Sequence, residues 1–265
     1  MLPTALLHAA PRDLPRAALV TGGARRLGRA IALALAGAGF DIALHSRAPT
    51  EPAMATAAEL RSTGRRVVLL HADLARESET ARLIPDAVAA LGPLGVLVNN
   101  ASMFERDTWD TATRASWDAH LEPNLRAPFV LIQAFARALP ATAEGVVINM
   151  LDQRVWSPTP FFVSYTVAKA ALWALTQSMA LALAPRIRVN AIGPGPALPS
   201  ARQTPEQFAA QCAMVPLGRG TSPEEIARAA LAILSLPAMT GQMIALDGGQ
   251  HLQWASGRSD PPLEE

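Results

Sequence analysis

The sequence predicts a doubly wound α/β fold, in which helices cover both faces of a parallel sheet. Short apolar runs alternate with longer Ala- and Leu-rich segments of helical pattern along most of the 265 residues. The short runs are continuously apolar, which is typical of parallel strands buried on both faces. Half of the residues are hydrophobic, enough for one large core, and neither a linker nor an internal repeat divides the chain.

The apolar runs give the predicted strands, in chain order 17–23, 40–47, 66–74, 96–102, 145–151, 186–195 and 241–249. Helices are predicted at 27–39, 51–63, 77–91, 111–120, 124–139, 164–184 and 223–236. Several of them end at a glycine or a proline, such as Gly64, Gly92 and Pro185.

We expect one domain over residues 16–252, with flexible tails at 1–15 and 253–265. The Pro-, Ser- and Gln-rich stretch 193–208 interrupts the alternation of strands and helices. It follows a strand, at the edge of the sheet where such folds bind ligands. A mobile lid is therefore expected there.

Composition argues against several kinds of protein. The formal net charge is +1, which gives no general case for binding nucleic acid or an acidic membrane surface. The apolar runs are interrupted before they reach membrane-spanning length. The 5 histidines show no metal-ligand spacing, so no metal is expected. Cys212 is the only cysteine, and this absence of an internal disulfide fits a cytoplasmic location.

The segment TGGARRLG, residues 21–28, joins the first strand to the first helix. Gly22 and Gly23 allow a tight turn, and Gly28 allows close packing of the helix. The N–H groups at the start of the helix would then face a phosphate. The spacing is not G-x-G-x-x-G, so a simple turn remains the alternative.

The end of the second predicted strand bears on the choice of cofactor. A dinucleotide site for NAD usually has an acidic residue there, which binds the ribose hydroxyls. This strand ends instead in His45, Ser46 and Arg47. A guanidinium and a hydroxyl suit a 2′-phosphate, which favours NADP over NAD. The alternative is that Arg47 is a solvated surface residue.

Tyr165 is the only tyrosine and Lys169 the only lysine of the chain. Four residues apart on a helix, they lie on one face. A neighbouring ammonium lowers the pKa of a phenol, which is otherwise about 10, and makes it a better proton shuttle. The pair is thus a candidate acid–base unit, although YxxxK also occurs in ordinary helices.

A series of motifs, in this order, resembles the short-chain dehydrogenase/reductase family from about residue 16 to 250. The series consists of TGGARRLG, ADL (72–74), NNAS (99–102), Asn124, the Tyr165/Lys169 pair, GPG (193–195) and LDGG (246–249). The resemblance implies a single Rossmann-like domain, a nicotinamide cofactor, hydride transfer to a small molecule and a homotetramer.

The resemblance also implies roles for single residues. Tyr165 would donate the proton, Lys169 would lower the tyrosine pKa and bind the ribose, and Asn124 would hold a relay water. The cofactor site would comprise Gly22, Arg25, Arg26, Leu27, Gly28, His45, Ser46, Arg47, Asp73, Leu74, Asn100, Ala101, Ser102, Met150, Tyr165, Lys169, Pro194 and Gly195.

Two departures from the family pattern resemble its pteridine reductase branch. Arg26 replaces the second glycine of the turn, and Asp152 replaces the serine thirteen residues before the tyrosine. In that branch Arg26 would contact phosphate and the pterin carbonyl, and Asp152 would assist protonation of a ring nitrogen. Phe104 would stack a flat ring against the nicotinamide, its alternative being a core residue. The substrate site would comprise Arg26, Ser102, Phe104, Asp152 and Tyr165.

We therefore predict an NADPH-dependent reductase of a pterin-like substrate. A carbonyl reductase of the same family, acting on a keto or oxoacyl group, is the nearest alternative, and the missing serine counts against it. A non-catalytic NADP-binding regulator is an alternative of another class, and the intact Tyr165/Lys169 pair counts against that one.

Overall fold

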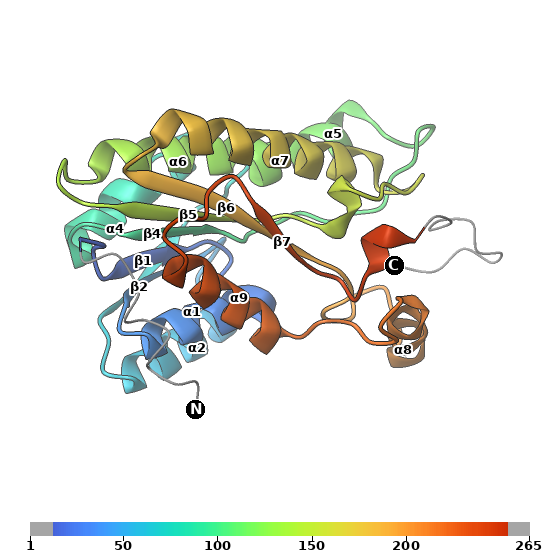
Figure 1. Ribbon diagram of the computed structural model, residues 1–265, viewed down its shortest axis with the longest axis horizontal. Helices are drawn as coiled ribbons and strands as arrows, with labels where there is room; N and C mark the ends of the chain where they lie inside the picture. The colour runs from blue at the N-terminus through green and yellow to red at the C-terminus, as the bar shows by residue number, and fades with distance from the viewer. Residues whose placement is uncertain (1–12, 254–265) are drawn as a thin grey trace.

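The computed structural model describes residues 13–253. It contains a seven-stranded parallel sheet with the strand order β3-β2-β1-β4-β5-β6-β7 and helices on both faces (Figure 1). The order reverses between β1 and β4, which is where doubly wound folds bind their ligands. The predicted fold class is confirmed.

All of the predicted strands are present, and each is shorter than predicted. They are β1 (Ala17–Val20), β2 (Asp41–Ser46), β3 (Val67–His71), β4 (Val96–Asn99), β5 (Gly145–Met150), β6 (Ile187–Pro194) and β7 (Met243–Leu246). Strand β1 pairs with β2 through Val20 and Leu44, and with β4 through Val20 and Val98.

The α-helices are α1 (Arg26–Gly37), α2 (Glu51–Ser62), α3 (Glu77–Thr80), α4 (Leu83–Leu91), α5 (Arg114–Leu121), α6 (Ala127–Ala138), α7 (Val163–Leu183), α8 (Pro205–Met214) and α9 (Pro223–Ser235). The predicted helix 77–91 is two helices. Those predicted at 111–120 and 124–139 are joined by a π-helical turn, η2 (Glu122–Arg126), into one continuous segment.

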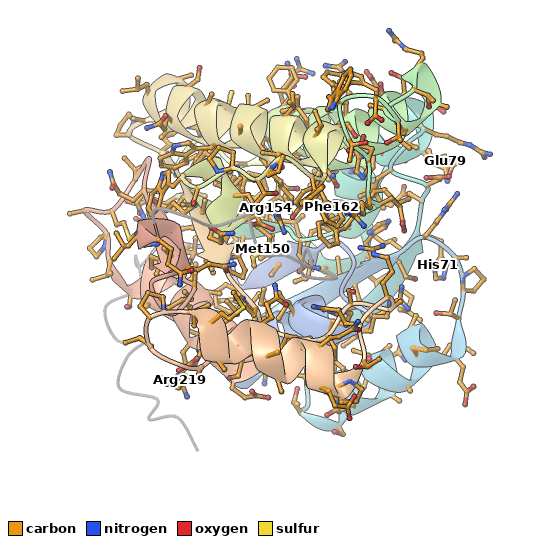
Figure 2. The ribbon with its side chains drawn as sticks, turned by 90° about the vertical axis from the view of Figure 1, so that its right-hand side faces the viewer. His71, Glu79, Met150, Arg154, Phe162 and Arg219 are labelled. Atoms are coloured by element: carbon orange, nitrogen blue, oxygen red, sulfur yellow. The ribbon has the colours of Figure 1, made fainter. Side chains whose placement is uncertain are left out.

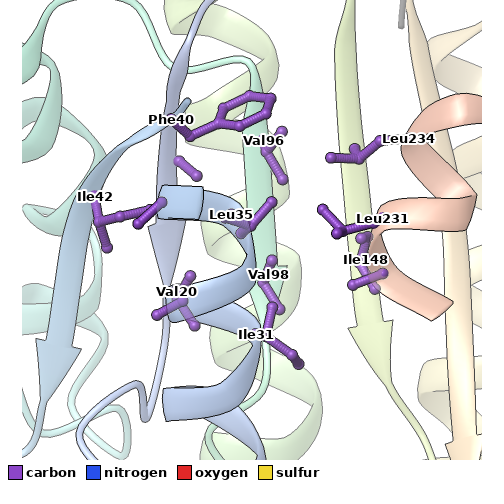
Figure 3. Packing of buried hydrophobic residues seen from close by; sticks show 14 of the residues in the cluster. Val20, Ile31, Leu35, Phe40, Ile42, Val96, Val98, Ile148, Leu231 and Leu234 are labelled. Atoms are coloured by element: carbon purple, nitrogen blue, oxygen red, sulfur yellow. The ribbon is translucent and has the colours of Figure 1, made fainter. Parts of the chain in front are cut away.

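The sheet separates two large apolar clusters. Helices α1 and α9 pack side by side over one face, with Ile31, Leu35, Leu231 and Leu234 against the strands (Figure 3). Helices α4 and α6 supply the cluster on the other face, with Phe135 among its members. With both faces covered, the strands are buried, which explains their continuously apolar sequences.

Two regions differ from expectation. The predicted irregular stretch 193–208 contains the first turn of α8, a helix that buries none of its side chains and so lacks an apolar stripe. At the other end of the chain Leu14 is only 4% exposed and belongs to the core. The expected tails otherwise lie outside the described residues, apart from residues 13–15 and 253.

Helix α7 is long and apolar enough to span a membrane by length and composition alone, with a mean hydropathy of 1.2 in its most apolar window. In the structure it lies along the sheet and contacts β6. Core helices of soluble proteins meet the same two criteria. Its sequence carries Tyr165 and Lys169 near its first turns.

Candidate active site

The glycine turn after β1 lies close to the end of β4. Gly22 has φ +61°, and a Cβ there would lie 2.9 Å from Ala101 Cα. Thr21 Oγ1 accepts hydrogen bonds from the backbone N–H groups of Asn100 and Ala101, at 2.9 and 3.0 Å. The Asn100 amide donates back to Thr21 O at 2.8 Å. Thr21, which sequence reasoning did not single out, thus links the end of β1 to the end of β4.

The N-terminus of α1 is suited to a phosphate. Arg25 is its N-cap residue and makes no side-chain capping bond, and the first turn contains no acidic residue. Gly28 lies so close to the turn that a Cβ would be 2.3 Å from Gly22 O. The first N–H groups, those of Arg26 to Gly28, therefore face the turn without a side-chain acceptor, which fits the diphosphate of a dinucleotide.

Arg26 occupies the position of the missing glycine in a left-handed conformation, with φ 54°. Its guanidinium donates to the carbonyl oxygens of Pro199 and Leu198, at 2.8 and 3.3 Å. Partial burial and the charge of Arg25 lower its pKa. The side chain thus connects the turn to the loop after β6. Its predicted contacts with phosphate and a pterin carbonyl stay a prediction.

At the end of β2, Arg47 is exposed and pairs with Asp73 at 2.9 Å. Ser46 is nearly buried, and its hydroxyl donates to Ala48 O at 3.0 Å. It also lies 3.0 Å from Nδ1 of His71, at the end of β3. The carboxyl end of β2 thus carries a hydroxyl and an exposed guanidinium paired with Asp73, two kinds of group that can bind a phosphate.

His45 and Leu74, two further residues of the predicted cofactor site, are buried. His45 Nδ1 accepts the Gly22 N–H at 3.2 Å, so the other ring nitrogen carries the proton and donates to Ala72 O at 3.0 Å. Burial lowers the His45 pKa. Leu74 is part of the core. Their predicted contacts with cofactor stay a prediction.

The catalytic candidates meet where β5 ends. Tyr165 donates its hydroxyl to Asp152 Oδ2 at 2.9 Å, and Lys169 donates to Met150 O at 2.7 Å. Tyr165 and Lys169 are nearly inaccessible, with exposed fractions of 6% and 2%. In Figure 2, Met150, Arg154 and Phe162 lie close together in this region.

The electrostatics differ from the expectation that Lys169 lowers the tyrosine pKa. Burial, followed by the Asp152 charge and hydrogen bond, raises the Tyr165 pKa well above its ordinary value. The cation that opposes this rise is Arg154. Burial lowers the pKa of Lys169 to about 8. Tyr165 is therefore held as a neutral acid, with its proton directed at a carboxylate.

Arg154 was not singled out from the sequence. Its side chain is 5% exposed and lies 3.9 Å from Asp152 Oδ1. Its backbone N–H donates to the same oxygen at 2.9 Å. These contacts leave Asp152 Oδ2 facing Tyr165. No spacing rule marks this arginine, because its role depends on a short 3₁₀ turn at Gln153–Val155.

Phe104 lies beside Tyr165, with ring centroids 4.6 Å apart in an edge-on arrangement. One face is already covered by Phe162, at 4.4 Å and 8° between the planes. The guanidinium groups of Arg154 and Arg202 lie over these two rings, at 5.1 to 5.9 Å from their centroids. The predicted stacking of a flat ligand on Phe104 stays a prediction.

Asn124 lies in the π-helical turn and is fully buried. Its side chain accepts from Met103 N and donates to Met103 O, both at 2.8 Å. The amide thus holds the segment that leads to Phe104, and its predicted contact with a relay water stays a prediction. Ser102 is exposed there, and its hydroxyl donates to Met103 O at 3.3 Å.

The loop after β6 closes the site from the opposite side. Pro194 ends the strand, and Gly195 donates to Leu246 O at 3.0 Å. Arg202 pairs with Glu105 at 2.9 Å. Together with the Arg26 contacts, this loop is attached to both the glycine turn and the segment after β4. Within residues 13–253, no group of three or more His, Cys, Asp or Glu side chains could hold a metal.

The fold and this site define a dinucleotide-binding oxidoreductase. Comparison with known proteins specifies the class. A family model described as enoyl-(acyl carrier protein) reductase matches residues 22–251. A Mycobacterium tuberculosis protein described as an uncharacterized oxidoreductase is 38% identical, over 88% of this chain and 91% of its own. A 3-oxoacyl-[acyl-carrier-protein] reductase FabG of Staphylococcus aureus is 31% identical, over 90% of this chain and 99% of the FabG chain.

A solved structure, FolM alternative dihydrofolate reductase 1 from Brucella canis complexed with NADP, is 43% identical to this chain. It covers 93% of this chain and 98% of its own, with a TM-score of 0.88. The chain belongs to the short-chain dehydrogenase/reductase family and is an oxidoreductase of that family. Within this family, the chain is similar to the pteridine-reductase-like branch.

Proposed function

We propose that this oxidoreductase uses NADPH to reduce a pterin-like substrate. The observation that carries the proposal is Asp152, whose carboxylate accepts the Tyr165 hydroxyl at 2.9 Å. A carboxylate at this place is a hydrogen-bond acceptor, where a carbonyl reductase of the family would have a serine hydroxyl.

The chemistry of Asp152 favours a nitrogen-rich ring. Ring N–H and amino groups of a pterin can donate to a carboxylate. The oxygen of a ketone gains negative charge as hydride is transferred, and a nearby carboxylate would repel it. The similarity to FolM alternative dihydrofolate reductase 1 from Brucella canis supports the same substrate class, because dihydrofolate contains a pterin ring.

NADP(H) is the cofactor in this proposal. The uncapped start of α1 suits its diphosphate, and Arg47 with Ser46 suits its 2′-phosphate. No carboxylate ends β2. Asp73, at the end of β3, is paired with Arg47. The FolM neighbour was solved with NADP.

Each side chain then has a defined task. The cofactor, when bound, supplies the hydride. Tyr165 donates the proton of its hydroxyl group to the substrate. Asp152 orients that hydroxyl and accepts a hydrogen bond from the substrate ring. Lys169, anchored on Met150 O at 2.7 Å, presents its charge below the tyrosine ring. Arg26 holds the loop after β6 over the glycine turn.

A keto- or oxoacyl-reductase activity is the second candidate. It is favoured by the family model described as an enoyl-(acyl carrier protein) reductase and by the FabG relative. Asp152 in place of the serine opposes it. A non-catalytic NADP-binding regulator is a third candidate, which the buried Tyr165–Asp152 contact opposes.

We also propose a cytoplasmic homotetramer. Helix α7 exposes apolar side chains on the surface that faces away from the sheet, with Val167 40% and Leu181 84% exposed. Only 28% of its most apolar window is buried within one chain. A second copy of the chain would cover this surface.

The test measures NADPH oxidation with dihydropterins, dihydrofolate, biopterin, simple ketones and an oxoacyl thioester. The proposal expects kcat/KM for a pterin to exceed every ketone or thioester value by at least about 100-fold, the range of a strongly discriminating polar contact. Efficient ketone reduction without pterin reduction would replace it with the second candidate. NADPH binding without any turnover would support the third.

A further inference from the structure

Asp107, Ser164 and His120 form a buried polar cluster that the proposed reaction does not use. Their exposed fractions are 4%, 0% and 1%. They come from the loop after β4, the first turn of α7 and the helix α5. The Ser164 hydroxyl is hydrogen-bonded to the Asp107 carboxylate and lies 2.7 Å from His120 Nδ1.

The surrounding partners define which atom donates in this cluster. His120 Nε2 lies 3.0 Å from the Glu105 amide nitrogen, which can only donate, so Nε2 accepts and Nδ1 carries the proton. Nδ1 therefore donates toward Ser116 O at 3.0 Å and Ser164 Oγ at 2.7 Å. The Ser164 hydroxyl in turn donates its hydrogen bond to the Asp107 carboxylate. A histidine that donates a hydrogen bond to a serine hydroxyl cannot accept the proton of that hydroxyl as a general base. This cluster is therefore not a hydrolytic site.

Asp107 also caps the helix that carries the catalytic tyrosine. Helix α7 starts after Phe162, which has φ 57° and provides no side-chain cap. Asp107 Oδ1 accepts the Ser164 N–H at 3.2 Å, and its backbone carbonyl accepts the Phe162 N–H at 2.7 Å. A carboxylate at a helix N-terminus satisfies free N–H groups and interacts favourably with the helix dipole.

This cap connects the two sides of the substrate site. Ser164 immediately precedes Tyr165, and the loop that supplies Asp107 also carries Phe104. The His120 ring lies edge-on to the Tyr165 ring with centroids 6.2 Å apart. The same histidine holds the Glu105 N–H, next to Phe104. A change in the cluster would therefore shift Tyr165 relative to Phe104.

We propose that Asp107, Ser164 and His120 are positioning residues for hydride transfer. They fix the Tyr165 hydroxyl against Asp152 and hold Phe104 at a set distance from it. None of the three touches the reacting atoms. Their role is independent of whether the substrate is a pterin or a ketone, because each requires the same tyrosine proton.

The principal test is Ser164→Ala, assayed on the substrate of the panel that the wild type reduces best. We expect kcat to fall about 10- to 100-fold, the effect of a small misplacement of a reacting group. The Kd for NADPH should stay within about twofold, because the glycine turn and Arg47 are unchanged. Ser164→Thr keeps the hydroxyl and should recover most of kcat.

Asp107→Asn keeps nearly the same shape but presents an N–H where the carboxylate accepts, and should lower kcat similarly. Because both substitutions break one hydrogen-bond chain, the double variant should lose little more than either single variant. Effects on log kcat that simply add would contradict a shared network. The experiment remains informative if Ser164→Ala folds poorly, because Asp107→Asn should lower kcat whereas Ser164→Thr should keep most of it.

Thr176→Val is the matched control. Thr176 lies on the same helix, eleven residues or about 16 Å beyond Tyr165 along its axis, and is 0% exposed. It donates to Leu172 O at 2.8 Å and accepts from Asn149 Nδ2 at 2.9 Å. It should lose stability with kcat within about twofold of wild type. If Thr176→Val lowers kcat as much as Ser164→Ala, or if folded Ser164→Ala keeps kcat within twofold, the positioning role is overturned. The absence of pterin turnover would refute the substrate proposal alone.

Discussion

The cofactor side and the catalytic side of this site are constructed differently. On the cofactor side the turn at Gly22 and the start of α1 present backbone atoms, and Arg47 is exposed. On the catalytic side Tyr165 and Lys169 are buried ionisable groups held by partners from other segments. The cofactor side depends on backbone that approaches too closely for a side chain at Gly22 or Gly28, whereas the buried polar groups of the catalytic side depend on every partner.

Each side also contains one residue other than glycine in the left-handed conformation. These are Arg26, with φ 54°, and Phe162, with φ 57°. Each such conformation costs about 1–2 kcal/mol and persists only where other contacts hold it. The loop carbonyls of Leu198 and Pro199 hold the first, and Asp107 holds the second. Each side of the site thus contains a left-handed residue that is held by hydrogen bonds with a segment distant in the sequence.

The largest expected effect lies on the catalytic side. Tyr165→Phe keeps the ring and removes the proton, so kcat should fall about 10²- to 10⁴-fold. The affinity for NADPH, measured by fluorescence titration, should stay near the wild-type value. A variant that retains most of its turnover would show that another group supplies the proton.

Asp152→Ser tests what distinguishes this catalytic side from that of a carbonyl reductase. The change replaces an acceptor that orients Tyr165 with a hydroxyl that can donate. We expect kcat/KM for pterins to fall about 100-fold and that for ketones to stay constant or rise. Binding of NADPH serves as the control. Parallel losses for both substrate types would mean that Asp152 is needed for structure and not for substrate choice.

On the cofactor side, Arg47→Ala should weaken NADPH much more than NADH. Because the side chain is exposed, the lost contact is worth about 1.5 kcal/mol, or roughly tenfold in Kd. Arg114→Ala removes an exposed arginine on α5 and is the matched control for net charge. Equal changes for NADPH and NADH would remove the basis for the 2′-phosphate assignment.

Lys169 allows a test by pH. Its pKa is lowered from 10.5 to about 8 in the folded protein, so between these values the unfolded chain binds a proton that the folded chain does not. Stability should therefore rise with pH in that window. Relative to Lys169→Met, the wild type should gain about 1–3 kcal/mol of unfolding free energy between pH 8 and pH 10. Urea titrations at both pH values measure it, and a constant difference would contradict the lowered pKa.

The smallest effect concerns strain at Arg26. Arg26→Gly and Arg26→Ala both lose the contacts with Leu198 and Pro199, but only glycine relieves the left-handed backbone. The glycine variant should be about 1 kcal/mol more stable than the alanine variant. Hydrogen exchange at residues 198–203 should be faster in both. Equal stabilities would show that the positive φ stores no strain.

The fold was predictable because its signals are local. Each strand is a short apolar run, and the helices end at glycine or proline signals such as Gly64 and Pro185. Helix α8 was missed because it buries no side chain, although Thr204 and Gln207 form a capping box that could have marked its start. The break between α3 and α4 was missed although Pro85, in the first turn of α4, is a helix-boundary signal.

The site was predictable where a motif has regular spacing. Tyr165 and Lys169 stand four residues apart on one helix, and Asp152 stands at the family's serine position. Arg154 and Asp107 follow no such spacing. Nothing in the local sequence indicates that a carboxylate 57 residues earlier caps α7 through Ser164.

The amino-acid sequence by itself therefore determined the doubly wound fold, the glycine turn and the placement of Tyr165 and Lys169 on one helix, because these follow from hydrophobic periodicity and short-range spacing. Only the tertiary structure decided the ionisation of Tyr165, the burial of His45 and the coupling of Asp107, Ser164 and His120. Burial and the proximity of charges set these properties. Both arise only when segments distant in the chain pack against one another.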